Sequence, residues 1–163
     1  MANAPRIRLA CGDDTEALRA LYRAAVLTTA APFYTAAQIA AWAGFADDAA
    51  AFTAWIEAAS TWVAADAAHD IVGFTGLASD TPPGHGHVTA LYVAPSAMRR
   101  GLGTRLLDVV IDAAAANGRS VLTTHASAVS RPLFERAGFR LVEAQRSPHG
   151  GVEFVRWWMR REG

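Results

Sequence analysis

Over the first third of the chain, apolar positions repeat every three or four residues after one short alternating stretch. Residues 7–10 alternate apolar and polar side chains as a strand does, and residues 15–27 then carry the helical repeat after two aspartates that can cap it. Thr35 follows a proline and caps a second, short predicted helix, and residues 47–59 predict a third. This part of the chain therefore predicts one strand followed by helices.

From Thr61 onward the period shortens to two, and β-branched and aromatic residues dominate. Residues 61–66, 70–78 and 85–93 are separated by two sequences typical of turns. We therefore expect an antiparallel meander of three strands.

The remaining sequence returns to helical spacing and then alternates between the two patterns. It predicts a helix from Leu102 that ends at the Asn117-Gly118 pair, a strand over 120–126, a short helix over 130–138, and two strands over 139–145 and 152–159. The whole order is strand, helices, three strands, helix, strand, helix, two strands. It indicates one α/β (α+β) domain over residues 1–163.

Composition limits the possible partners. The chain has 163 residues, 52% of them hydrophobic, enough for one sizeable core. Its 15 basic and 15 acidic side chains cancel, so we expect no nucleic-acid or membrane partner, and any anion site must be local. Cys11 is the lone cysteine; it excludes an intramolecular disulfide, provides no metal cluster, and is expected to be buried. No apolar stretch approaches the roughly 20 residues that cross a bilayer and no signal pattern opens the chain, so a cytoplasmic location is expected.

The most informative stretch is LYVAPSAMRRGLGTRLL, residues 91–107, which joins a predicted strand to a predicted helix through a basic turn. Gly101 and Gly103 lack Cβ atoms, so a bulky ligand can approach the backbone N–H groups closely. The N–H groups from Met98 to Thr104 can converge at the start of the helix, where the helix dipole favours negative charge. Two arginines and a threonine hydroxyl add positive charge and a further donor. The turn therefore predicts a phosphate site, whose candidate residues are Met98, Arg99, Arg100, Gly101, Leu102, Gly103 and Thr104.

Two other phosphate-binding turns do not match, and a tight strand-to-helix connection without a ligand is the plain structural alternative. A Walker P-loop requires a lysine after its second glycine, and this turn has none. A dinucleotide fingerprint requires a third glycine where Leu106 stands, and its strand does not follow an antiparallel meander.

With its surroundings, the stretch closely resembles the coenzyme A pyrophosphate loop of the GNAT N-acetyltransferase superfamily. In that loop an apolar strand ending in Val-x-Pro is followed by Arg or Gln-x-x-Gly-x-Gly or Ala. The downstream LFERAGFRLVE, residues 133–143, resembles the family's short helix and strand, and the predicted element order matches as well. More loosely, FYTAAQIAAWAGF and THASAVSRPLFERAGF resemble the YafP-like branch. One departure is Met98, where the family usually has Arg or Gln; the loop binds phosphate mainly through main-chain N–H groups, so a cofactor loop is still implied.

The resemblance implies a mixed, mostly antiparallel sheet flanked by helices, with two central strands that splay apart to form a cleft for acetyl-CoA. Here those strands are HVTALYV and SVLTTHA. The pantetheine is expected to pair with the first strand. A main-chain N–H in the stretch Leu91, Tyr92 and Val93 is expected to polarise the thioester carbonyl.

Two histidines are candidate bases, because an attacking amine with a pKa of ~10.4 must lose its proton. His87 occupies the strand position where many family members carry a glutamate base, and an imidazole titrates near neutrality. The alternative is that His87 is a polar residue of an exposed turn. His125, at the end of the second central strand, is the second candidate, and its alternative is a hydrogen-bonded core histidine.

Four further residues complete the predicted site. Phe134 replaces the family's usual tyrosine acid, so the thiolate, with a thiol pKa near ~8.5, is expected to leave unassisted or to be protonated by water. Ser127 is expected to bond the pantetheine or a bridging water or, alternatively, to cap the next helix. Tyr34 is the predicted acceptor contact, and Trp42 is predicted as mostly core with an acceptor contact as its second role.

The prediction is acetyl transfer from acetyl-CoA to a primary amine of a small molecule or peptide by direct attack. Transfer of another acyl group is the alternative reaction. A non-catalytic acyl-CoA-binding or regulatory module is the alternative class of function. The sequence does not fix the oligomeric state, and a homodimer is the alternative to a monomer.

Overall fold

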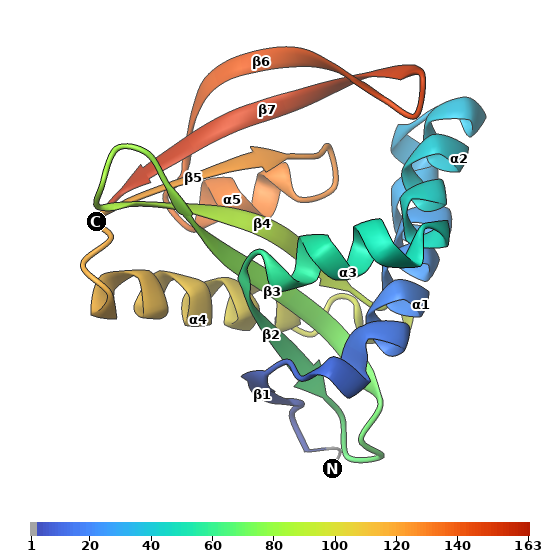
Figure 1. The fold of residues 1–163 in the computed structure, drawn as a ribbon, viewed down its shortest axis with the longest axis horizontal. Coiled ribbons are helices and arrows are strands. Elements are labelled where there is room, and N and C mark those ends of the chain that lie inside the picture. Colours follow the sequence, from blue (N-terminus) through green and yellow to red (C-terminus); the bar gives the residue numbers. More distant parts are fainter. Residues whose placement is uncertain (1–2) are drawn as a thin grey trace.

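A computed structural model describes residues 3–163, in which seven strands form one mixed sheet (Figure 1). The strands are β1 (Arg6–Leu9), β2 (Ser60–Ala65), β3 (Ile71–Asp80), β4 (His85–Val93), β5 (Val121–Ala126), β6 (Arg140–His149) and β7 (Val152–Glu162). They lie in the order β1-β2-β3-β4-β5-β7-β6, and every neighbouring pair is antiparallel except β4 and β5. The predicted meander and the mixed, mostly antiparallel sheet are confirmed.

Helices cover both faces of this sheet. They are α1 (Thr15–Ala25), α2 (Ala36–Gly44), α3 (Ala49–Glu57), α4 (Leu102–Ala116) and α5 (Arg131–Arg136). One buried core joins α1 and α3 to β3 through Leu18, Phe52 and Phe74. A second core, on the other face, joins α4 to β5 through Val110 and Leu122. The sheet is therefore the middle layer of three.

The helix termini follow the predicted signals with two differences. Thr35 caps α2 in a capping box with Gln38, as expected, and Gly118 takes a left-handed φ of +70° just after α4. The helix expected over 15–27 is α-helical only to Ala25 and continues as a π turn over Val26–Ala30, where β-branched residues lower the α propensity. Cys11 is exposed, contrary to expectation, because it lies in the surface turn before α1.

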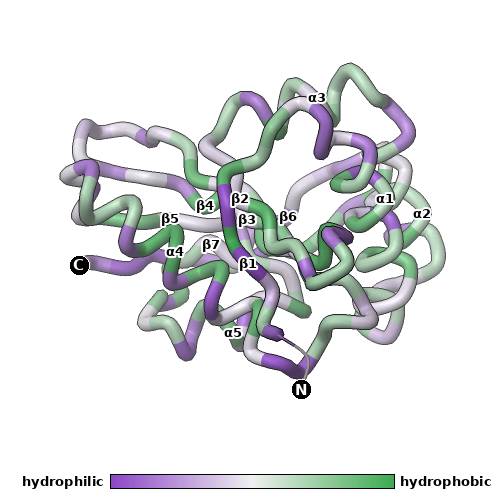
Figure 2. The backbone as a smooth tube through the Cα atoms, turned by 90° about the horizontal axis from the view of Figure 1, so that it is seen from below, coloured by the Kyte–Doolittle hydropathy of each residue, from purple (hydrophilic) through white to green (hydrophobic). Residues whose placement is uncertain are grey.

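The longest helix shows how the sequence pattern becomes packing. In α4, the side chains of Leu102, Leu106 and Val110 are buried against the sheet, while Arg105 and Asp108 are exposed. Figure 2 shows the corresponding change between hydrophobic and hydrophilic segments along this helix. No helix in the described part of the chain is both long and apolar enough to cross a membrane.

The side chain of Asp14 links β1 to the start of α1 through hydrogen bonds. Its carboxylate accepts two hydrogen bonds from Arg8, at 2.8 and 3.0 Å, and one from the Cys11 N–H at 2.8 Å. Its side chain does not cap α1, which corrects one expected role. The Arg8 hydrogen bonds are the main reason that the pKa of Asp14 falls to about 2.

Replacing this carboxylate should destabilise the protein in a pH-dependent way. Because the pKa of Asp14 is lowered on folding, its contribution is present above the unfolded pKa near 4 and is lost as pH falls toward 2. We expect Asp14→Asn to lower the free energy of unfolding at pH 7 by about 1–2 kcal/mol, the lower end reflecting the half-exposed Arg8. Urea denaturation at pH 7 and pH 3 measures the effect. Asp13→Asn, at the exposed neighbouring position, is the control and should change little; equal losses in both variants would contradict this account.

Candidate active site

β4 and β5 run side by side only over their first four residues. The pairing extends from His85 opposite Val121 to Val88 opposite Thr124, and the Thr124 hydroxyl donates to the Val88 carbonyl at 3.0 Å. Beyond this point β4 continues to Val93 without pairing to β5, and the two strands diverge (Figure 1). The divergence leaves one edge of β4 without a partner strand.

The hydrogen-bond alternation of an antiparallel pair tells which main-chain groups face this gap. Ala94 donates its N–H to the Val72 carbonyl at 2.8 Å, so alternate residues of β4 before it, including Tyr92, also bond to β3. The N–H and C=O groups of Leu91 and Val93 therefore point away from β3, into the gap. Tyr92, which was predicted with Leu91 and Val93, bonds to β3 through its main chain, so only its side chain is available to the site.

A β-bulge sits where the strands part. Leu77 pairs with Val88 and Gly76 pairs with Ala90, so Thr89 has no partner in β3. A Cβ on Gly76 would clash with the Thr89 hydroxyl. The absence of a side chain at Gly76 therefore leaves room for Thr89 at the bulge. The bulge reverses which side chains of β4 face each layer beyond this point.

The predicted phosphate turn follows β4 and has the backbone conformation of an anion-binding nest. Arg99 and Gly101 both have positive φ, +63° and +75°, and flank Arg100 before α4 begins at Leu102. Gly101 is the N-cap and makes no side-chain cap, so the first N–H groups of α4 have no side-chain partner from that residue. A Cβ on Gly101 would meet nothing within 4 Å, so its surroundings are open.

Gly103 lines the cavity, as predicted, and also has a packing role. A Cβ there would lie 2.9 Å from a terminal methyl of Leu133 in α5 and 3.8 Å from Val93. The missing side chain therefore lets α5 pack closely against α4. Of the two glycines, Gly101 has open surroundings, whereas a side chain at Gly103 would meet α5.

A cavity of about 810 Å³ connects the gap, the turn and the aromatic residues of α2. Its lining brings together all but one of the predicted site residues: Tyr34, Trp42, His87, Leu91, Tyr92, Val93, Met98, Arg99, Gly101, Leu102, Gly103, Thr104, His125, Ser127 and Phe134. Arg100 is exposed and lies outside this lining. Arg99 does line the cavity. Only one arginine of the pair therefore brings positive charge to the turn in which Met98 replaces the family's usual Arg or Gln.

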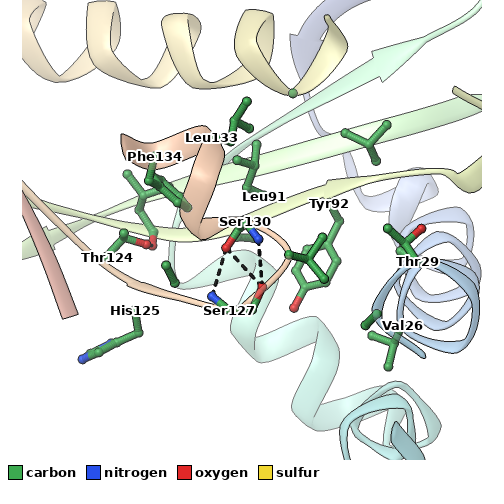
Figure 3. A pocket seen from close by; sticks show the side chains of 18 of the residues that line it. Val26, Thr29, Leu91, Tyr92, Thr124, His125, Ser127, Ser130, Leu133 and Phe134 are labelled. Carbon is green, nitrogen blue, oxygen red and sulfur yellow. Dashed lines mark hydrogen bonds between the residues drawn. The ribbon is translucent and has the colours of Figure 1, made fainter. Parts of the chain in front are cut away.

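The two predicted histidines are neighbours across the parallel strands. The ring centroids of His87 and His125 are 5.1 Å apart, and His87 Nδ1 lies 2.8 Å from the Thr123 hydroxyl. His125 is exposed, which contradicts the expected core position, because it points away from the face occupied by Thr124 and α5 (Figure 3). Burial lowers the pKa of His87, and the positive charge of Arg156 lowers it further, although Asp80 opposes this change.

Phe134 and Ser127 lie at the other wall of the cavity. Phe134 is 2% exposed and packs edge-on against Phe139 with a centroid distance of 5.0 Å. The Ser127 hydroxyl accepts a hydrogen bond from the Ser130 N–H at 3.1 Å, in the turn that leads into α5 (Figure 3). Ser127 therefore stabilises the turn before α5 and lines the cavity, but the N-cap of α5 is Ser130 and not Ser127 as the alternative role required.

The aromatic residues predicted for the acceptor side form hydrogen bonds within the protein through their polar atoms. The Tyr34 hydroxyl accepts a hydrogen bond from the Ala128 N–H at 2.9 Å, and Trp42 Nε1 donates to the Tyr92 hydroxyl at 3.2 Å. Tyr34 and Trp42 pack edge-to-face at 5.3 Å. They form a stable aromatic wall that closes one side of the cavity.

Two arginines of the lining were not predicted. Arg136 ends α5, and Arg156 lies on β7, where its Nε donates to the Gln145 side chain at 3.3 Å. Together with Arg99 they make the lining cationic, since none of its described residues is an aspartate or glutamate. Arg136 lies within the recognised stretch 133–143, whereas no motif marks Arg156, which the pairing of β7 beside β5 brings to the cavity.

A model of the acetyltransferase (GNAT) domain matches residues 30–160, which include the gap, the turn and most of the residues that line the cavity. The chain belongs to the GNAT acetyltransferase family. The N-acetyltransferase YafP of Escherichia coli (strain K12) is 33% identical over 147 residues, covering 90% of this chain and 89% of YafP. The predicted family and its YafP-like branch are therefore confirmed.

Solved structures of GNAT proteins share this fold over almost the whole chain. A GCN5-related N-acetyltransferase from Rhodopseudomonas palustris is 27% identical, with a TM-score of 0.88, and the match covers 99% of this chain and 98% of that one. The PaiA N-acetyltransferase from Thermoplasma acidophilum, solved in complex with coenzyme A, has a TM-score of 0.81 at 16% identity, covering 99% of this chain and 100% of that one.

Proposed function

We propose that residues 1–163 form a single-domain N-acetyltransferase that moves an acetyl group from acetyl-CoA to a primary amine of a small molecule or peptide. The observation that carries the proposal is the unpaired edge of β4, which opens into one cavity with the Gly101 turn and two histidines. Family membership supports the reaction, and the coenzyme A held by PaiA supports the cofactor. The coenzyme supplies an activated thioester when it is bound.

The residues present fit this cofactor. The open turn at Gly101 offers main-chain N–H groups to the diphosphate, and Arg99 and Arg136 add positive charge beside it. The outward N–H and C=O groups of Leu91 and Val93 can pair with the pantetheine amides as an added strand does. One of these N–H groups then polarises the thioester carbonyl, which lowers the barrier to attack by an amine.

His87 is the base in this proposal. Its pKa is lowered, so at neutral pH the imidazole is uncharged and can accept the proton that the attacking amine loses. His125 is the second candidate, at the mouth of the same cavity. With Phe134 in place of a tyrosine, the thiolate leaves unassisted or takes its proton from water or from the protonated base.

The remaining parts of the proposal concern partners. The net charge of zero supports a small-molecule or peptide acceptor and argues against nucleic acid or an anionic membrane. The lone cysteine suits a cytoplasmic location. β6 is an edge strand with Leu141 and Val142 exposed, which supports a homodimer; light scattering tests it.

The cationic lining predicts which amines react. An acceptor with a carboxylate near its amine can pair with Arg156, whereas a diamine finds no acidic partner in the described lining. We expect amino acids and similar amines to have higher kcat/KM than diamines of equal length in a panel assayed with acetyl-CoA. Arg156→Gln should raise KM for the carboxylate-bearing amines by about tenfold, the value of one charge-assisted hydrogen bond, and should leave KM for simple amines unchanged.

The same panel tests the reaction itself. All 15 basic residues of the chain are arginines, so the protein offers no lysine that could add background by self-acetylation. Turnover of any amine above background supports the proposal. Tight coenzyme A binding with no turnover across the panel would instead establish a non-catalytic acyl-CoA-binding module, and preference for a longer acyl-CoA would establish transfer of another acyl group.

A further inference from the structure

Behind His87, on the side away from the cavity, lies a part-buried hydrogen-bond chain. The Thr123 hydroxyl donates to Asp80 Oδ2 at 2.9 Å, and the Thr123 hydroxyl oxygen lies 2.8 Å from His87 Nδ1. Thr123, the middle residue of this chain, is 4% exposed, whereas Asp80 and His87 are partly buried. The three side chains come from β5, β3 and β4, neighbouring strands of the sheet.

The chemistry of a hydroxyl group fixes the direction of both hydrogen bonds. Burial raises the pKa of Asp80, but hydrogen bonds from the Thr81 N–H and the Thr123 hydroxyl, and the nearby histidines, lower it to a greater extent. The carboxylate is therefore ionised at neutral pH and can only accept. The Thr123 hydroxyl has one hydrogen, which it gives to Asp80, so its oxygen must accept from His87. His87 Nδ1 then carries the ring proton.

We propose that Asp80 and Thr123 are positioning residues that hold neutral His87 with its proton on Nδ1 and its lone pair on Nε2. The proposal rests on the function proposed above, because it explains how His87 is made ready to act as the base. In the described chain Nε2 makes no hydrogen bond to protein, and the ring lines the cavity. The sequence gives no sign of this chain of contacts, because Asp80 and Thr123 are 43 positions apart.

The proton balance is simple. As the amine nitrogen bonds to the thioester carbon, its proton passes to His87 Nε2 and the ring becomes an imidazolium. Asp80 keeps its negative charge and Thr123 keeps its proton, so nothing moves beyond the ring. The carbon–sulfur bond of the thioester breaks with its electron pair on sulfur, and the imidazolium would give its proton to solvent or to the leaving sulfur.

Two charged groups act on the pKa of His87, and two further histidines lie close to it or to Asp80. Asp80 of β3 stabilises the imidazolium, while Arg156 of β7 destabilises it. His125 of β5 lies beside the ring, and His85 of β4 faces Asp80. Loss of the Asp80 charge should therefore lower the pKa of His87 further.

Nitrogen-15 NMR of the free protein with labelled histidines reads the tautomer directly at a pH where His87 is neutral. We expect a protonated Nδ1 and an unprotonated Nε2, with His87→Ala used to assign the signal. In Asp80→Asn the amide can donate to the Thr123 oxygen, which turns the hydroxyl toward Nδ1, so the proton should move to Nε2. A wild-type ring protonated on Nε2, or an unchanged tautomer in Asp80→Asn, overturns the proposal.

Kinetics provides the second readout, in the complete enzyme with the best amine of the panel. Asp80→Asn should lower kcat by at least about tenfold at pH 7.5, since the wrong tautomer offers no lone pair to the amine. Thr123→Val should also lower kcat, and Thr123→Ser should restore it, because serine keeps the hydroxyl. Asp108→Asn, the same change on the exposed face of α4, should have no effect.

The two readouts separate this inference from the proposed function. The tautomer is measured without substrate, so an inert amine panel beside the expected NMR result would reject the acetyltransferase and leave the hydrogen-bond chain intact. Active wild type whose kcat is unchanged by Asp80→Asn and Thr123→Val would reject the positioning role alone. If Thr123→Val does not fold, the NMR and kinetic measurements on Asp80→Asn and Thr123→Ser still test the proposal.

Discussion

His87→Ala should lower kcat for amine acetylation at pH 7 by about 10²–10⁴-fold, the usual contribution of a general base. The affinity for coenzyme A should stay the same, because His87 lies on the acceptor side of the gap and not in the turn around Gly101. Steady-state kinetics at saturating acetyl-CoA and amine measures the first effect, and calorimetry with coenzyme A measures the second.

The pH profile of kcat adds a signature that a merely misfolded variant would lack. In the wild type, the base is lost only when His87 is protonated, and burial lowers its pKa from the ordinary imidazole value, so kcat should stay level through neutrality and fall only at acidic pH. Without the imidazole, the bound amine must lose its proton to water. In His87→Ala, kcat should therefore rise about tenfold per pH unit until the pKa of the amine is reached.

His85→Ala is the matched control, since His85 lies on the same strand but does not line the cavity. It should keep wild-type kcat at pH 7 and, like the wild type, a level profile through neutrality. A His87→Ala variant with unchanged kcat would remove His87 from the mechanism; in that case His125→Ala tests the second candidate.

Gly101→Val should weaken coenzyme A binding by at least about tenfold. Valine at the φ of +75° found here is strained by roughly 1–2 kcal/mol, so the turn should relax to another conformation and turn its N–H groups away from a common point. A tenfold loss corresponds to about 1.4 kcal/mol. Isothermal titration calorimetry measures the dissociation constant, and a thermal melt of the free protein reports any loss of stability.

Gly103→Ala is the control for this change, because it alters the second glycine of the same turn. Its Cβ would meet the flexible end of Leu133, which can move, and no positive φ is involved. We expect near wild-type affinity. Equal losses in both variants would mean that packing of α5, not the conformation at Gly101, controls coenzyme binding.

Much of the fold could be predicted from the sequence because its local signals agree with one another. The Thr35 cap, the turn sequences of the meander and the glycines after α4 and α5 each mark an element end that the structure confirms. The basic turn was recognisable because the glycine spacing and the following helical repeat depend on neighbouring residues only.

The side-chain environment of the site was not predictable in the same way, because it depends on strand register. Strict alternation places His87 and Leu91 on the same face of β4, but the bulge at Thr89 separates them. Leu91 packs with Val88 toward α4, whereas His87 bonds Thr123 on the opposite face.

A structure determined with acetyl-CoA bound is the most direct test of the whole account. We predict diphosphate oxygens within about 2.7–3.2 Å of main-chain N–H groups in residues 99–104, and pantetheine amides paired with Leu91 and Val93 across the gap between β4 and β5. Coenzyme density elsewhere, with the Gly101 turn filled by the protein's own side chains, would contradict it.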